Sequence, residues 1–190
     1  MIAALDARPI VIALAGPNGA GKTTFFHAHL QPAALRFVNA DDLARELDVD
    51  VYEGARLAQE LRQVLVDQRE SFVFETVFSD PAGAKLDFLR RAEAAGYEVI
   101  LCFIGVDGPT ECEQRVAMRV LQGGHDVPTE KLLARFPRTL RNLATAIREL
   151  PRVLVYDNGD LGHPFRQVAE FQRGTPVLLN PPLPAWLEWK

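Results

Sequence analysis

An eight-residue glycine-rich segment places the strongest constraint on how this chain can fold. Residues 16–23 read GPNGAGKT, the spacing Gly-x4-Gly-Lys-Thr, and they join an apolar run at 9–15 (PIVIALA) to an amphipathic stretch at 21–30. Glycines allow backbone dihedrals that are closed to other residues, so successive N–H groups can point at one anion, and the next helix adds its positive dipole end. The pattern therefore predicts a buried strand, a phosphate-binding loop and a helix.

The rest of the chain alternates short apolar runs with longer amphipathic ones. Further strands are predicted at 36–39, 71–75, 97–106 and 152–156, and helices near 43 and at 52–69, 81–95, 109–121 and 128–150. This order predicts an α/β, three-layer P-loop NTPase/kinase fold, with a parallel five-stranded sheet flanked by helices. Pro137 is expected to kink or split the last helix. A C-terminal β-hairpin is predicted at 165–179, turning at Arg173-Gly174.

Length and composition indicate a single domain over residues 1–190. We expect a core at about 9–158, a lid at about 119–135 and a C-terminal extension at 159–190. A net charge of −4 argues against a nucleic-acid partner, and no apolar run is long enough to cross a membrane. The N-terminus has no signal-peptide pattern, and the two cysteines form no disulfide framework, so a cytoplasmic location is expected.

Each position of the glycine-rich loop has a predicted role toward a nucleoside triphosphate. The nucleotide contacts are expected from Gly16, Pro17, Asn18, Gly19, Ala20, Gly21, Lys22, Thr23 and Thr24, with Asn158 beside the base. Lys22 supplies a positive charge to the β- and γ-phosphates, and the hydroxyl of Thr23 is the expected magnesium ligand. ATP is the expected nucleotide, with GTP as the alternative.

Carboxylates follow the predicted second and third strands, at the edge of the sheet where ligands bind. Asp41 is the first carboxylate after the second strand, and a kinase needs a group that accepts the proton of the attacking hydroxyl. Asp41 and Asp42 could equally be N-caps of the helix that begins near Leu43. Glu75 and Thr76 end the third strand, where they could hold a metal-bound water or a substrate hydroxyl, or face solvent.

A basic segment separates the predicted fourth and fifth strands. It contains Arg115, Arg119, His125, Arg135, Arg138 and Arg141, around the hinge-like pair Gly123-Gly124. Guanidinium groups in a lid would neutralise the charge that develops on a transferred phosphoryl group. A solvated basic face is the alternative for any one of these arginines.

Five segments in order, GPNGAGKTT, NADDLA, SFVFETVFS, GGHDVPTEKLLARFPRTLRNL and VYDN, resemble the zeta toxin family of P-loop kinases. The resemblance runs from about residue 10 to residue 158. It implies an enzyme that uses ATP and magnesium to phosphorylate a hydroxyl of UDP-N-acetylglucosamine and that an antitoxin protein restrains.

The resemblance also assigns roles to individual residues. It implies that Asp41 is the catalytic aspartate, that Lys22 and Thr23 bind the phosphate and the metal, and that Arg119 or Arg115 is a lid arginine. Lys22, Arg119 and Arg135 are expected to act with Asp41 in catalysis. Acceptor contacts are expected from Glu75, Thr76, Arg56, Arg115 and His125. His125 lies near the place where the family carries a second lid arginine, and Arg135 is the candidate to replace that charge.

The sequence thus predicts a kinase of a small molecule with an alcohol group as acceptor. Two alternatives remain open: a nucleoside- or polynucleotide-type kinase on the same scaffold, and a nucleotide-switch ATPase that signals to a partner. A switch needs a water-positioning residue and ordered loops rather than a hydroxyl acceptor and a lid, so Asp41 and the arginines favour the kinase.

Overall fold

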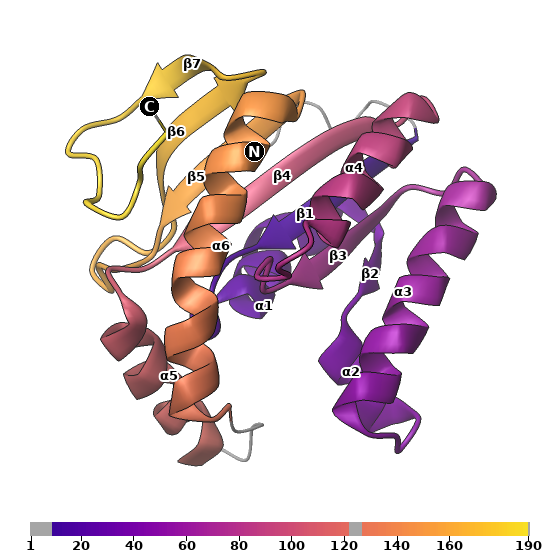
Figure 1. The fold of residues 1–190 in the computed structure, drawn as a ribbon, viewed down its shortest axis with the longest axis horizontal. Coiled ribbons are helices and arrows are strands. Elements are labelled where there is room, and N and C mark those ends of the chain that lie inside the picture. Colours follow the sequence, from indigo (N-terminus) through magenta and orange to yellow (C-terminus); the bar gives the residue numbers. More distant parts are fainter. Residues whose placement is uncertain (1–8, 122–126, 190) are drawn as a thin grey trace.

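The computed structural model describes residues 9–121 and 127–189 (Figure 1). The strands are β1 (Ile10–Ala15), β2 (Arg36–Val38), β3 (Phe72–Thr76), β4 (Glu98–Gly105), β5 (Arg152–Asp157), β6 (Arg166–Gln172) and β7 (Thr175–Leu179). The helices are α1 (Lys22–Phe25), the π-helical turn η1 (Phe26–Leu30), the 3₁₀ turn η2 (Gln31–Ala33), α2 (Ala40–Glu46), α3 (Val51–Asp67), α4 (Ala84–Ala94), α5 (Pro109–Leu121) and α6 (Thr129–Glu149).

Within the described ranges the strands form one seven-stranded sheet in the order β2-β3-β1-β4-β5-β6-β7. The pairings among β1 to β5 are parallel, and β6 and β7 are added antiparallel at one edge. The predicted fold class is therefore confirmed, and so is the hairpin that turns at Arg173-Gly174. The sheet has seven strands rather than five because the hairpin continues it.

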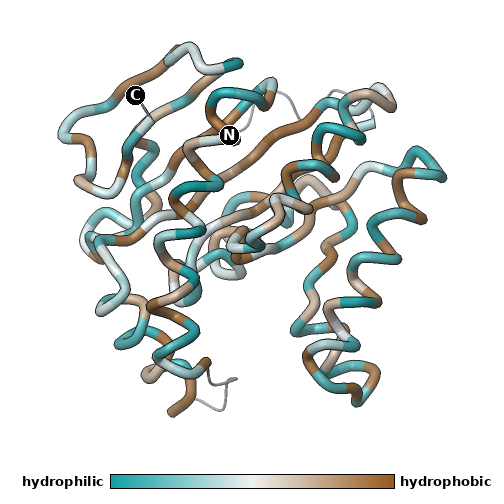
Figure 2. Tube along the Cα trace, viewed as in Figure 1, coloured by the Kyte–Doolittle hydropathy of each residue, from teal (hydrophilic) through white to brown (hydrophobic). Residues whose placement is uncertain are grey.

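Alternating side chains of the central strand enter different cores on the two faces of the sheet. Val11 and Ala13 pack with α3, α4 and α6, whereas Ile10 and Ile12 pack with α1, η1 and the start of α5. Every residue of β1 is fully buried, and Figure 2 shows the hydrophobic colour concentrated on these inner strands. This two-sided burial fixes the start of the glycine-rich loop. No helix in the described ranges is both long and apolar enough to cross a membrane.

The predicted split of the last helix at Pro137 is wrong, because α6 runs from Thr129 to Glu149 without a break. The alternative, a kink at this proline, stays a prediction. The residues that follow the proline fasten the helix to the loop after β3. Arg138 Nε donates to the carbonyl of Ser79, and Thr139 Oγ1 donates to that of Val77, at 3.1 and 3.0 Å. Asn142 Nδ2 adds bonds to the carbonyls of residues 78 and 80 at 2.9 and 3.1 Å. These tertiary bonds offset the backbone hydrogen bond that a proline removes.

The proline-rich C-terminal segment is anchored by Trp186. Its ring is 7% exposed and lies 5.8 Å from the ring of Phe103 on β4. A side chain on Gly105 would have no room, since a Cβ atom there would lie 2.2 Å from Cζ2 of Trp186. The segment after the hairpin therefore packs on the end of β4, one strand away from the glycine-rich loop.

Candidate active site

The glycine-rich loop joins β1 to α1 in a conformation that only glycine adopts readily. Gly16, Gly19 and Gly21 have φ of 146°, 77° and 90°. A Cβ atom on Gly16 would lie 2.1 Å from the carbonyl oxygen of Ile104, and one on Gly21 would lie 2.8 Å from Nδ2 of Asn158. The predicted strand, loop and helix are thus present. The positive φ angles and the lack of room for a Cβ atom both require glycine in this loop.

Lys22 folds back over the loop that precedes it. The residue is 6% exposed, and its Nζ donates to the carbonyl of Pro17 at 3.0 Å and lies 3.7 Å from Oε1 of Glu75. Burial lowers the pKa of Lys22, although the negative charges of Glu75 and Asp41 act in the opposite direction. The ammonium group therefore sits in a desolvated position at the loop, where an added anion would gain most from it.

The buried side chain of Asn158 holds one further position of the loop, the carbonyl of Ala20. Asn158 Nδ2 donates to the carbonyl of Ala20 at 2.9 Å, and Asn158 Oδ1 accepts from the N–H of Phe165 at 3.3 Å. Asn158 is 5% exposed, so it contacts the loop as well as the cavity beside it. The buried Oδ1 of Asn18 has no hydrogen-bond partner among the described residues.

A three-residue network connects the loop to the second and third strands. Thr23 Oγ1 donates to Oε2 of Glu75 at 2.8 Å, and Asn39 Nδ2 donates to the same oxygen at 3.2 Å. Asn39 Oδ1 in turn accepts from the backbone N–H of Asp41 at 2.9 Å and of Asp42 at 3.4 Å. Through these hydrogen bonds Glu75 connects Thr23 on α1 to Asn39 at the start of α2.

The start of α2 corrects the expectation that Asp41 or Asp42 caps this helix. Asn39 is the N-cap, α2 begins at Ala40 rather than near Leu43, and both aspartates lie in the first turn. Asp42 pairs with Arg45 at 2.6 Å. The side chain of Asp41 is not used as a cap, and it lines a cavity with Glu75. Its carboxylate is therefore available to a ligand in that cavity.

Two cavities in the described part of the chain meet at Glu75. The larger, about 510 Å³, is lined by Gly19, Gly21, Lys22, Thr23, Thr24, Glu75, Arg115, Met118, Arg119, Asn158, Leu161, Pro164 and Phe165. The smaller, about 180 Å³, is lined by Asn39, Ala40, Asp41, Ala55, Ala58, Arg62, Glu75, Thr76, Val77 and Lys85. The loop residues and Asp41 therefore lie in neighbouring cavities that share one carboxylate.

The two arginines of α5 both lie on the loop side. The positive charge of Arg119 contributes to the lowered pKa of Lys22, and Arg119 lines the larger cavity. Arg115 Nη2 donates to the carbonyl of Asn158 at 2.6 Å, and the residue pairs with Glu111 at 2.5 Å. Arg115, predicted to contact the acceptor, thus lines the loop cavity instead. His125 lies outside the described residues.

Two further predicted arginines are placed away from both cavities. Arg135, on α6, lines a third cavity of about 330 Å³ that Thr76 and Lys85 also line. Arg56 lines neither of the two cavities, because it lies on the exposed side of α3, paired with Glu53 and Glu60. The structure therefore brings together the predicted residues from the loop, Asp41, Glu75, Thr76 and α5, but it places neither Arg135 nor Arg56 in these two cavities.

The sequence interpretation missed three residues that line the smaller cavity. Asn39 was readable, because an asparagine before an acidic first turn is a typical N-cap. Arg62 was readable in part, since it shares helical spacing with the buried Ala58 and Leu65. Lys85 gave no signal, because only the fold brings the start of α4 beside α3.

The sheet order and the glycine-rich loop define an α/β P-loop fold. Residues 11–143 match the AAA_33 family, described as an AAA domain, which is more than half of the chain. The chain therefore belongs to this family. No curated protein matches it.

Solved structures share this fold at low sequence identity. A chain of the AvrRxo1-ORF1:AvrRxo1-ORF2 complex with ATP matches with a TM-score of 0.71 and 19% identity over 91% of this chain and 61% of that one. A chain of the PezAT chromosomal toxin–antitoxin system of Streptococcus pneumoniae matches at 0.63 and 18%, over 86% and 72%. A chain of the Pnkp1/Rnl/Hen1 RNA repair complex matches at 0.59 and 17%, over 73% and 46%.

Proposed function

We propose that this protein is an ATP- and magnesium-dependent kinase that transfers the γ-phosphate to a hydroxyl group of a small molecule. The observation that carries the proposal is the pair of cavities meeting at Glu75. One cavity contains the phosphate-binding loop, and the other contains the carboxylate of Asp41. A phosphoryl donor and an acceptor could thus meet at one boundary, as direct transfer requires.

On the donor side, the backbone N–H groups of residues 16–24 and the ammonium group of Lys22 would bind the triphosphate. Asn158 would position the loop through its hydrogen bond to the carbonyl of Ala20, and it lines the same cavity. The crystal of the AvrRxo1 complex contained ATP, which favours ATP over GTP as the donor here.

The residues around Thr23 suit a magnesium ion. The hydroxyl of Thr23 and the carboxylate of Glu75 are oxygen ligands, the type that this hard cation prefers, and they lie next to the loop. A bound magnesium ion would neutralise charge on the phosphate oxygens during transfer. Thr23 and Glu75 are the residues that would hold it, directly or through water.

On the acceptor side, Asp41 would accept the proton of the attacking hydroxyl. The hydroxyl oxygen forms a bond to the γ-phosphorus, the bond from that phosphorus to the β,γ-bridging oxygen breaks, and ADP leaves. Arg119, beside Lys22, would stabilise the negative charge on the transferred group. Arg135 faces a cavity that adjoins the acceptor side, and its catalytic role stays a prediction.

UDP-N-acetylglucosamine is the leading acceptor, and an antitoxin is the leading protein partner, acting in the cytoplasm. The resemblance to zeta toxins supports both, and the likeness to the PezAT toxin–antitoxin structure supports the antitoxin. A polynucleotide-type kinase is the second candidate, favoured by the likeness to the RNA repair complex and opposed by the net charge of −4.

The proposal is tested by incubating the protein with γ-labelled ATP, magnesium and a panel of sugar nucleotides, nucleosides and oligonucleotides. We expect label on one small-molecule class, none with Lys22→Ala, and ATP binding without transfer for Asp41→Asn. Labelled inorganic phosphate as the sole product, at a rate that no acceptor changes, would favour the nucleotide-switch ATPase and refute the kinase.

A further inference from the structure

Arg62 is a buried cation without an ion-pair partner among the residues that the structure describes. It projects from the face of α3 that packs on the sheet, between Ala58 and Leu65, and it is 5% exposed. Its Nε has no hydrogen-bond partner, and Arg62 forms no ion pair with any residue in the described ranges. Burial lowers the pKa of Arg62 to about 10. An isolated buried charge destabilises a fold by several kcal/mol.

Aromatic rings supply only part of the missing stabilisation. The guanidinium carbon lies 5.0 Å from the ring centre of Phe74 and 5.7 Å from that of Phe88. Such cation–π contacts stabilise a buried cation only modestly, and they leave the buried Nε of Arg62 without a hydrogen-bond acceptor. The rings therefore position the group without neutralising it.

A second cation lies beside the first. Lys85, at the start of α4, is half-buried, and its ammonium group forms no ion pair within the described part of the chain. Burial lowers the pKa of Lys85, and the positive charge of Arg62 lowers it further, whereas Asp80 acts in the opposite direction. Two neighbouring cations repel each other, so an anion placed between them would relieve both costs.

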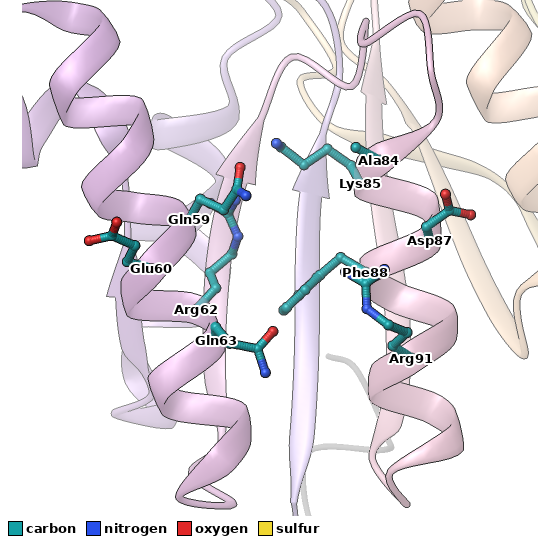
Figure 3. A pocket seen from close by; sticks show the side chains of 9 residues that line it. All are labelled: Gln59, Glu60, Arg62, Gln63, Ala84, Lys85, Asp87, Phe88 and Arg91. Carbon is teal, nitrogen blue, oxygen red and sulfur yellow. The ribbon is translucent and has the colours of Figure 1, made fainter.

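Arg62 and Lys85 lie between the smaller cavity, which contains Asp41, and an outer groove between α3 and α4. Both line the cavity of about 180 Å³ that contains Asp41, and both line a groove of about 370 Å³ between α3 and α4. Figure 3 shows the two side chains reaching from these helices into the space between them. Glu60 and Asp87 also line the groove, but Glu60 pairs with Arg56 and Asp87 pairs with Arg90. A ligand that reaches Asp41 from the groove passes the two cations.

We infer that Arg62 and Lys85 form an oxyanion-binding subsite on the acceptor side, and that the acceptor is a small molecule bearing a phosphate or carboxylate group. The inference deepens the proposed kinase function. Anion binding by Arg62 and Lys85 does not depend on that function, but the identification of the anion as part of the phosphoryl acceptor rests on it. A planar guanidinium binds both kinds of oxyanion through paired N–H groups, and the adjacent ammonium adds a second positive charge.

Calorimetric titration with inorganic phosphate, and in parallel with acetate, tests the subsite directly. The loop is first saturated with magnesium and a non-hydrolysable ATP analogue, so that it cannot bind the probe. Wild type should bind one equivalent of phosphate or acetate, and Arg62→Met and Lys85→Met should each weaken it at least about tenfold, or 1.4 kcal/mol. Arg45→Met, an exposed arginine on α2, serves as the charge-matched control and should bind as wild type does.

Thermal unfolding without ligand separates binding from structure. Arg62→Met should be as stable as wild type or more stable, because an apolar residue of similar length removes an uncompensated charge. A purely structural arginine would instead give a lower melting temperature and unchanged anion affinity. That result, or no binding of either anion by wild type, overturns the subsite.

The acceptor arm uses matched pairs of compounds, such as a sugar with its phosphate ester and with its carboxylate. Arg62→Met should raise the KM of the anionic member at least about tenfold and leave the KM of ATP unchanged. Preference for the neutral member, with turnover intact, refutes the inference while the kinase function stands. Absence of turnover with any acceptor refutes the kinase function, and the phosphate titration still decides the subsite.

Discussion

Replacing Asn39 tests whether one side chain both caps α2 and positions Glu75. Its oxygen accepts from two backbone N–H groups, and its nitrogen donates to Glu75 at 3.2 Å. Loss of an N-cap costs about 1 kcal/mol, and loss of a hydrogen bond to a charged group costs about 1.5–3 kcal/mol. Asn39→Ala should therefore lower the free energy of unfolding by about 2–4 kcal/mol, or the melting temperature by about 5–15 °C for a chain of this length.

Two further variants separate these contributions. Asn39→Ser keeps an oxygen for the cap but is too short to reach Glu75, so it should be about 1 kcal/mol more stable than Asn39→Ala. Asn39→Asp keeps the cap but places a carboxylate against Glu75. The repulsion raises the folded-state pKa of the new carboxyl group, so this variant should gain stability relative to wild type as the pH falls through that pKa.

Urea denaturation followed by circular dichroism, at several pH values, measures these differences. The reasoning is refuted if Asn39→Ala unfolds within about 0.5 kcal/mol of wild type, as a surface substitution would. Equal losses for the serine and alanine variants would show that the cap contributes nothing.

Three other substitutions test the glycine-rich loop, the packing of Trp186 and the role proposed for Arg119. Gly16→Ala should abolish ATP binding in calorimetry, because its Cβ would meet the Ile104 carbonyl at 2.1 Å, whereas Gly108→Ala, with nothing within 4 Å, should bind normally. Gly105→Ala should lower the free energy of unfolding by about 1–3 kcal/mol through overpacking against the Trp186 ring, and a second change of that tryptophan to leucine should restore part of it in urea denaturation. Arg119→Ala should lower kcat more than it weakens ATP binding in steady-state kinetics and calorimetry; an effect on affinity alone would contradict its role in transfer.

Most of the fold could be predicted because local patterns agree with the tertiary structure. The run at 9–15 has the pattern of a central strand. The hairpin turn could be predicted from Gly174, because glycine favours turns, and the structure shows Arg173 and Gly174 in the left-handed region, with φ of 45° and 81°. The split predicted at Pro137 is wrong, and the sequence could not show this, since the bonds that stabilise α6 there go to carbonyls of residues 77–80, far away in sequence.

The sequence indicated which residue types line the candidate site, but it could not show which of their charges are paired. The loop spacing identifies Lys22 and Thr23, and strand ends identify Asp41 and Glu75, because parallel strands bring their carboxyl ends together. The sequence could not show that Arg62 lacks a counter-ion or that Arg56 has two, since both are arginines on one helix. Which of them faces the sheet depends on the packing of α3.

The position of Glu75 bears on the design of inhibitors for this protein. Because this carboxylate lines both cavities and accepts hydrogen bonds from Thr23 and Asn39, a compound that bridges the two cavities must pass it. A linker with a hydrogen-bond donor at that point would be tolerated, whereas a negatively charged linker would be repelled. One side chain thus sets the chemical character of any compound that spans the two cavities.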